Sequence, residues 1–207
     1  MSAHFGYALV ALLVIIDPAG TAVLFIGMTP HNTAAERAGQ AIKACIIAFI
    51  VLAAFGLGGE VLLSALGISL PAMKVAGGIL LFLTAADMVT ASGVLRATPD
   101  ERAAARAEND VSVFPLAIPF VAGPGAMTTM VLLHSQAGGD VAAIAALQLA
   151  LVVATAITLA LLLMAQPVAR LLGATGANVI GRVLGVLLAA LAAQIVIDGI
   201  RQSLAGG

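Results

Sequence analysis

The feature that most constrains this chain is a pair of helix-breaking segments, each set inside a long apolar run. Residues 16–21 read IDPAGT and interrupt an apolar run that extends from residue 5 to residue 28. Residues 118–125 read IPFVAGPG and interrupt an apolar run of the second half in the same way. Backbone that leaves its helix at membrane depth is tolerated only where it is buried in protein or lines a polar cavity. Two such breaks, one in each half of a chain, are typical of the binding site of a transporter.

The composition places the chain among polytopic membrane proteins. It is 62% hydrophobic and 9% charged, with a mean hydropathy of +1.15. A soluble protein of this length would expose too much apolar surface. The lipid bilayer is therefore the expected surroundings. The net charge of −1 and the lack of a Lys/Arg cluster exclude a basic face for nucleic acid.

Six segments are long and apolar enough to cross a bilayer, which needs about 20 mostly apolar residues per helix. They are residues 5–28, 41–66, 71–91, 111–133, 142–164 and 178–200. The longest polar stretch, residues 96–110, separates the third segment from the fourth. We therefore expect a first three-helix repeat over 1–95, a cytoplasmic linker over 96–110 and a second repeat over 111–207, all in one membrane domain.

The basic residues predict the orientation, because cytoplasmic loops are enriched in Lys and Arg. The first, third and fifth loops are flanked by Arg37, Lys43, Arg96, Arg102, Arg106, Arg170 and Arg182, whereas the opposite side has Lys74 and Arg201. This bias predicts that both termini lie outside the cytoplasm. Three helices per half then give the second half the inverted orientation seen in many secondary transporters. The predicted fold is an all-α transmembrane protein of six helices, arranged as two inverted three-helix repeats whose first helices (helices 1 and 4) are broken near the midplane.

Asp17 is the candidate ionisable residue of the first break. It lies roughly 20 Å along a helical path from His4, close to the membrane midplane. A carboxylate at that depth costs about 3 kcal/mol or more unless it faces a polar interior. One interpretation is a helix cap, since Asp followed by Pro18 suits the start of a helix. The other is contact with a ligand or a coupling ion. The two are compatible because a carboxylate has two oxygens.

Each break also creates a half-helix that begins near the midplane. Exposed amides and the helix dipole make such an end attractive to an anionic group. Amides of residues 125–128 could therefore receive a carboxylate, while Asp17 or freed carbonyls receive an ammonium group. This arrangement predicts a site for a small zwitterion, and a purely structural kink is the alternative. The candidate substrate-binding residues are Asp17, Pro18, Gly20, Thr21, Gly123, Pro124, Gly125, Ala126, Thr128 and Thr129.

Three stretches together resemble the MarC/SnatA family of six-helix membrane proteins. They are IDPAG at residues 16–20, VAGGILLFL at 75–83 followed by Asp87-Met88, and PLAIP through AGPGA across 115–126. A further Pro common in the family is missing here, where Ala22 and Val23 stand. The resemblance implies a protein of the bacterial plasma (inner) membrane, within the wider superfamily of LysE-type exporters. One branch of the family is described as transporting small neutral amino acids such as glycine and alanine.

The leading hypothesis is a secondary transporter of small neutral amino acids, with alternating access around the two broken helices. Proton or sodium coupling is expected, with Asp17 as the coupling residue. No cofactor and no metal ligands are expected, and the oligomeric state is left open. The alternatives are a transporter of metal ions or other small solutes and a non-transporting membrane protein. An intramembrane enzyme is not expected. A serine protease would need a Ser and a His deep in the membrane, and each His lies close to a predicted loop. Asp17→Asn and Gly125→Leu are predicted to abolish transport without unfolding the protein.

Overall fold

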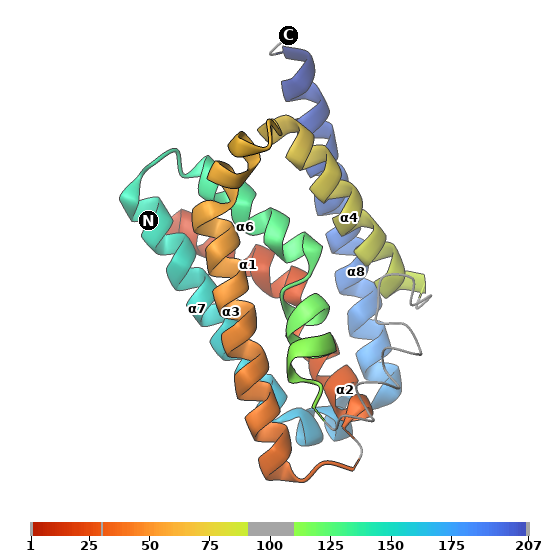
Figure 1. The fold of residues 1–207 in the computed structure, drawn as a ribbon. Helices are drawn as coiled ribbons and strands as arrows, with labels where there is room; N and C mark the ends of the chain where they lie inside the picture. Colours follow the sequence, from red (N-terminus) through yellow and green to blue (C-terminus); the bar gives the residue numbers. More distant parts are fainter. Residues whose placement is uncertain (1, 30, 91–109, 206–207) are drawn as a thin grey trace.

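The computed structural model describes residues 2–29, 31–90 and 110–205, which form helices joined by short connections and contain no strand (Figure 1). The helices are α1 (Ser2–Ile16), α2 (Pro18–Met28), α3 (Ala34–Ala65), α4 (Leu70–Thr90), η1 (Ser112–Val121), α6 (Pro124–Gln136), α7 (Val141–Leu163) and α8 (Ala165–Ala205). Both termini lie toward the end of the molecule opposite the α2–α3 connection (Figure 1).

The described residues contain four candidate membrane spans, or five if the bent pair η1 and α6 is one span. The first span runs from His4 to Met28, across the break between α1 and α2. The third predicted span, residues 71–91, forms α4, but its described apolar stretch is only Leu70–Leu83. The all-helical membrane fold is therefore confirmed, and the count of six spans stays a prediction. Residues 96–109 of the predicted linker lie outside the described residues, as do the side chains of Asp87 and Arg170.

The last helix is longer than predicted. We expected it to begin at residue 178, whereas α8 begins at Ala165, directly after Met164. Pro167 does not prevent this, because it falls in the first turn of α8, where no helical hydrogen bond needs its missing N–H. The predicted loop between the fifth and sixth spans is therefore largely helical.

Helices of the first half pack mainly against helices of the second half. α4 runs along α8, α3 contacts η1, α6 and α7, and α1 and α2 both contact α7. α2 also contacts α8. Among the described residues, contacts within one half are limited to small ones, chiefly α6 with α7 and α7 with α8. One core results, in which Leu12 and Leu52 of the first half are buried together with Leu116 and Leu151 of the second.

Glycines allow α4 and α8 to approach backbone to backbone. A Cβ at Gly78 of α4 would lie 3.0 Å from the Ala192 carbonyl oxygen and 3.1 Å from the Val196 amide nitrogen of α8. A Cβ at Gly199 of α8 would lie 2.9 Å from the Pro71 carbonyl oxygen of α4. Small residues at such an interface let van der Waals packing hold two helices together in lipid.

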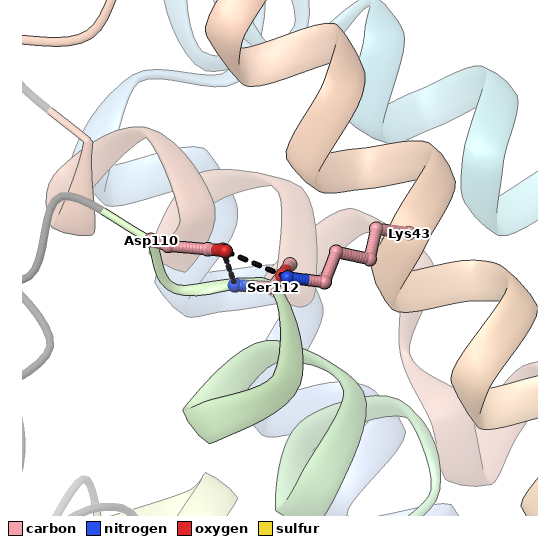
Figure 2. A network of polar contacts seen from close by, with 3 residues as sticks. All are labelled: Lys43, Asp110 and Ser112. Carbon is pink, nitrogen blue, oxygen red and sulfur yellow. Dashed lines mark hydrogen bonds and ion pairs between the residues drawn. The ribbon is translucent and has the colours of Figure 1, made fainter.

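An ion pair joins α3 to the start of η1 (Figure 2). Lys43 Nζ lies 2.8 Å from Asp110 Oδ2, and the Ser112 amide donates to Asp110 Oδ1 at 2.9 Å. Hydrogen bonds from Lys43 and Ser112 lower the pKa of Asp110 from 3.8 to about 2. The two charged side chains are 51% and 45% exposed, so the pair fixes the entry to η1 without adding much stability.

Gly78→Ala is expected to destabilise the protein by about 1–3 kcal/mol, because the new methyl group has no space between two backbones. Thermal unfolding in detergent measures the change. Gly58→Ala is the matched control, since a Cβ at Gly58 of α3 meets nothing within 4 Å. Equal stability of the two variants would show that α4 and α8 are not closely packed.

Asp110→Asn is expected to change the acid dependence of stability. The pKa of Asp110 is lower in the folded state, so its contribution is complete above about pH 5 and is lost as the pH falls toward about 2. The difference in unfolding free energy between wild type and variant should stay below about 1 kcal/mol, because the pair is exposed. Unfolding followed between about pH 2 and 7 tests this. Lys43→Ala should remove most of the same pH dependence of stability. If the unfolding free energy of Asp110→Asn ran parallel to that of wild type from about pH 2 to 7, Asp110 would not be the group that titrates.

Candidate functional site

The first break is closed by the side chain of Asp17. Its backbone adopts the left-handed conformation, with φ 45° and ψ 68°, which ends α1. Asp17 Oδ1 then accepts a hydrogen bond from the Gly20 amide at 3.1 Å, and Pro18 begins α2. A Cβ at Gly20 would overlap the Asp17 carboxylate in its present position, so glycine allows this close approach. The predicted capping role of Asp17 is therefore present in the structure.

The carbonyl group freed at this break is also satisfied within the chain. The Thr21 hydroxyl donates to the Ile16 carbonyl oxygen at 3.0 Å, and the Thr21 amide donates to the Asp17 carbonyl oxygen at 2.9 Å. Thr21 is buried, so its hydroxyl serves the backbone rather than an open site. The first break thus supplies its own hydrogen-bond partners.

The second break is longer and sharper. Pro115 and Pro119 lack N–H groups and prevent a regular α-helix, so η1 forms wide turns. Leu116 donates to the Val111 carbonyl oxygen at 3.1 Å, and Ala122 donates to the Ala117 carbonyl oxygen at 2.8 Å. α6 then leaves η1 at an angle of 53°.

The N-terminus of α6 has no side-chain cap. Gly123 precedes the helix in extended conformation, and a Cβ there would lie 2.6 Å from the Pro119 carbonyl oxygen. The Met127 amide is the first to bond within the helix, to the Gly123 carbonyl oxygen at 3.0 Å. The amides of Gly125 and Ala126 therefore lie in a first turn that no side chain caps. The two breaks differ in this respect: α2 is capped by a carboxylate and α6 is not.

The two breaks meet in the core. A Cβ at Gly125 would lie 3.8 Å from Ile15 Cγ2, and Ile15 lies two residues before Asp17. α1 contacts α6, and α2 contacts η1, so the two broken helices cross antiparallel. The structure thus brings the start of α6 close to the end of α1, and a substrate site shared by the two breaks stays a prediction.

Two residues of α4 at this junction were not among the predicted site residues. A Cβ at Gly125 would overlap Leu81, and a Cβ at Gly77 would overlap Thr128. Sequence reasoning assigned Gly77 only to helix packing. The sequence does hold a sign of this contact in the adjacent glycines Gly77 and Gly78. α4 contacts α6 at Gly77 and α8 at Gly78.

The two threonines of α6 differ in their bonding. The Thr128 hydroxyl donates to the Pro124 carbonyl oxygen at 2.9 Å. The Thr129 hydroxyl is buried and has no hydrogen-bond partner in the described part of the chain. Within the same residues, no three His, Cys, Asp or Glu side chains lie close enough to hold a metal ion.

The chain is similar to membrane proteins of bacteria and archaea over almost its whole length. A model for the family described as "MarC family integral membrane protein" matches residues 2–204. A UPF0056 membrane protein of Archaeoglobus fulgidus is 37% identical over 194 residues, which cover 93% of this chain and 90% of that protein. The UPF0056 inner membrane protein YhgN of Escherichia coli is 33% identical over 201 residues, which cover 96% and 97%. No solved structure matches the chain.

Asp17→Ala is expected to destabilise the protein more than Asp140→Ala. Each change removes an N-cap, at a cost of about 1 kcal/mol, but only Asp17 has a left-handed backbone, which adds roughly 1–2 kcal/mol for Ala. Asp17→Asn should be nearly neutral, because Asn caps helices and tolerates the left-handed conformation. Thermal unfolding of the three variants measures the difference. Equal losses for the two Ala variants would mean that the backbone at Asp17 is unstrained.

Proposed function

Because this chain belongs to the MarC family of integral membrane proteins, we propose that it is a secondary transporter of small neutral amino acids such as glycine and alanine. The observation that carries the proposal is the uncapped N-terminus of α6, placed where the two breaks meet. Its amides and the helix dipole suit a carboxylate. We propose transport rather than catalysis, driven by a proton or sodium gradient.

Asp17 is the proposed partner of the substrate ammonium group and the coupling residue. It stands at the other break, on the chain segment that meets Gly125 through Ile15. The same carboxylate that caps α2 through the Gly20 amide would also bind the cation. Ile15 and Leu81 lie close around Gly125, which favours a substrate with a small side chain.

We further propose that the two halves are inverted repeats of three helices each. The contacts support this, because they occur in exchanged pairs. α1 and α2 contact α7, while η1 and α6 contact α3. α2 contacts α8, while α6 contacts α4. A two-fold axis in the membrane plane would generate these pairs, and rocking of one repeat against the other would give alternating access. Kinship with LysE-type exporters is part of the same proposal.

The protein is an integral multi-pass membrane protein. We propose that it lies in the bacterial inner membrane, as the name of its Escherichia coli relative states for that protein. Arg37 and Lys43 lie at the beginning of α3, at the end opposite the termini (Figure 1). By the distribution of basic residues, that end would be cytoplasmic and both termini would be outside.

Uptake of labelled glycine and alanine into proteoliposomes, under an imposed proton or sodium gradient, tests the function. We expect saturable uptake that unlabelled alanine inhibits. Propionate, which lacks the ammonium group, and ethylamine, which lacks the carboxylate, should not inhibit it. Asp17→Asn should reduce the rate at least about tenfold while the protein stays folded, since this loss corresponds to about 1.4 kcal/mol, less than one charge-assisted hydrogen bond can contribute.

Asp140→Asn is the matched control, because Asp140 caps α7 at its exposed start. Gly125→Leu is a poorer test than the sequence suggested, since a side chain there would also overlap Leu81. Absence of uptake from folded protein under every gradient would exclude amino-acid transport. Metal ions, other small solutes and a non-transporting role would then be the remaining hypotheses.

A further inference from the structure

Thr129 differs from the other buried threonines of the described residues. The hydroxyls of Thr21, Thr29, Thr128, Thr155 and Thr158 each donate to a backbone carbonyl oxygen. Thr129 is 5% exposed, and its hydroxyl has no such partner. A buried hydroxyl left without a hydrogen bond costs about 1–3 kcal/mol. Such a group calls for an explanation, and a hydrogen bond to a bound water or solute is one.

α6 is held firmly on two sides and loosely on a third. Toward α3, a Cβ at Gly56 would lie 2.8 Å from Met130 Cε, and a Cβ at Gly59 would overlap Val131. Toward α4, Gly77 gives space to Thr128. In contrast, α6 makes few contacts with α1 and α7.

The loosely packed side of α6 is the side that bears Thr129. Thr129, Leu133 and Gln136 follow one another at helical spacing and therefore share a face. Leu133 and Gln136 line a cavity of about 40 Å³, which has room for a few water molecules. The cavity lies between the start of α1, the end of α6 and the start of α7. Its other lining residues are His4, Tyr7, Ala8, Ala137, Ala143 and Leu147.

The same side of α1 leads from this cavity to the two breaks. His4, Ala8, Ala11 and Ile15 also recur at helical spacing. The first two line the cavity, and Ile15 meets Gly125 at the start of α6. The boundary between α1, α6 and α7, called the seam below, therefore runs from the cavity to the uncapped amides, and it is packed shut by the buried side chains of Ala8, Ala11 and Ile15.

We propose that this seam is the passage by which a solute reaches the breaks from the end that holds the termini. The Thr129 hydroxyl binds the solute through a hydrogen-bond acceptor such as a carboxylate oxygen. Leu147, which lines the cavity and is 3% exposed, closes the passage in the present structure. The identity of the solute as an amino acid rests on the proposed function, whereas the passage itself does not.

Cysteine labelling tests the passage without any substrate. In a Cys45→Ala background, Thr129→Cys and Ala137→Cys are treated with a charged, membrane-impermeant thiosulfonate. The reagent is added on the side of the membrane that holds the C-terminus, which is identified by protease cleavage of a C-terminal tag. Both cysteines should be modified. Val131→Cys is the matched control, since Val131 is also buried in α6 but faces Gly59 of α3. Modification of Thr129→Cys no faster than Val131→Cys would overturn the passage.

Kinetics then test the role of Thr129. Thr129→Val should raise the KM for glycine uptake about tenfold with little change in maximal rate, because one hydrogen bond to the solute is lost. Thr158→Val, a buried threonine bonded to its own helix, should leave KM unchanged. An unchanged KM in Thr129→Val would remove Thr129 from the site. Labelling without uptake would keep the passage and reject the amino acid, whereas uptake without labelling would keep transport and reject the passage.

Discussion

The packing of one half of the chain against the other is the constraint on which the rest of this structure depends. In lipid there is no hydrophobic drive to bring helices together, so close contact and small residues must hold them. Here those contacts run between the halves: α4 against α8 through Gly78 and Gly199, and α6 against α3 through Gly56 and Gly59. The two broken helices are placed across one another because each is held by helices of the opposite half. The candidate site at their crossing therefore depends on the contacts between the two halves.

The two breaks look alike in sequence, but the backbone groups they free are treated differently in the structure. At the first, Asp17 and Thr21 satisfy the groups that the break frees, and the chain continues as one span. At the second, Gly123 offers no side chain, and two prolines widen η1 before α6 turns away. As a result, a side chain caps the N-terminus of α2, whereas no side chain caps that of α6. Under the proposed function, the carboxylate of the substrate binds at that break, where the first-turn amides and the dipole of α6 lie.

Much of this arrangement could be predicted from sequence, because Pro, Gly and Asp act locally. The two breaks, the cap by Asp17 and most helix positions followed from the residues themselves. The early start of α8 did not, since the prediction followed the apolar stretch of residues 178–200 and a helix can extend beyond such a stretch. Leu81 and Gly77 were also missed as site residues, because only the packing of α4 on α6 brings them there. The unpartnered hydroxyl of Thr129 depends on the surroundings of one atom, which no sequence pattern specifies.

The partnership of α4 with α8 has a consequence for how the protein is made. Helices enter the bilayer in chain order, but the main partner of α4 is α8, which is synthesised only after η1, α6 and α7. Until then, the glycine face of α4 must rest against lipid or against another protein. Assembly is therefore separate from insertion and comes late. A nascent chain that stops before α8 would carry an unpaired helix face, the kind of surface that membrane quality control could recognise.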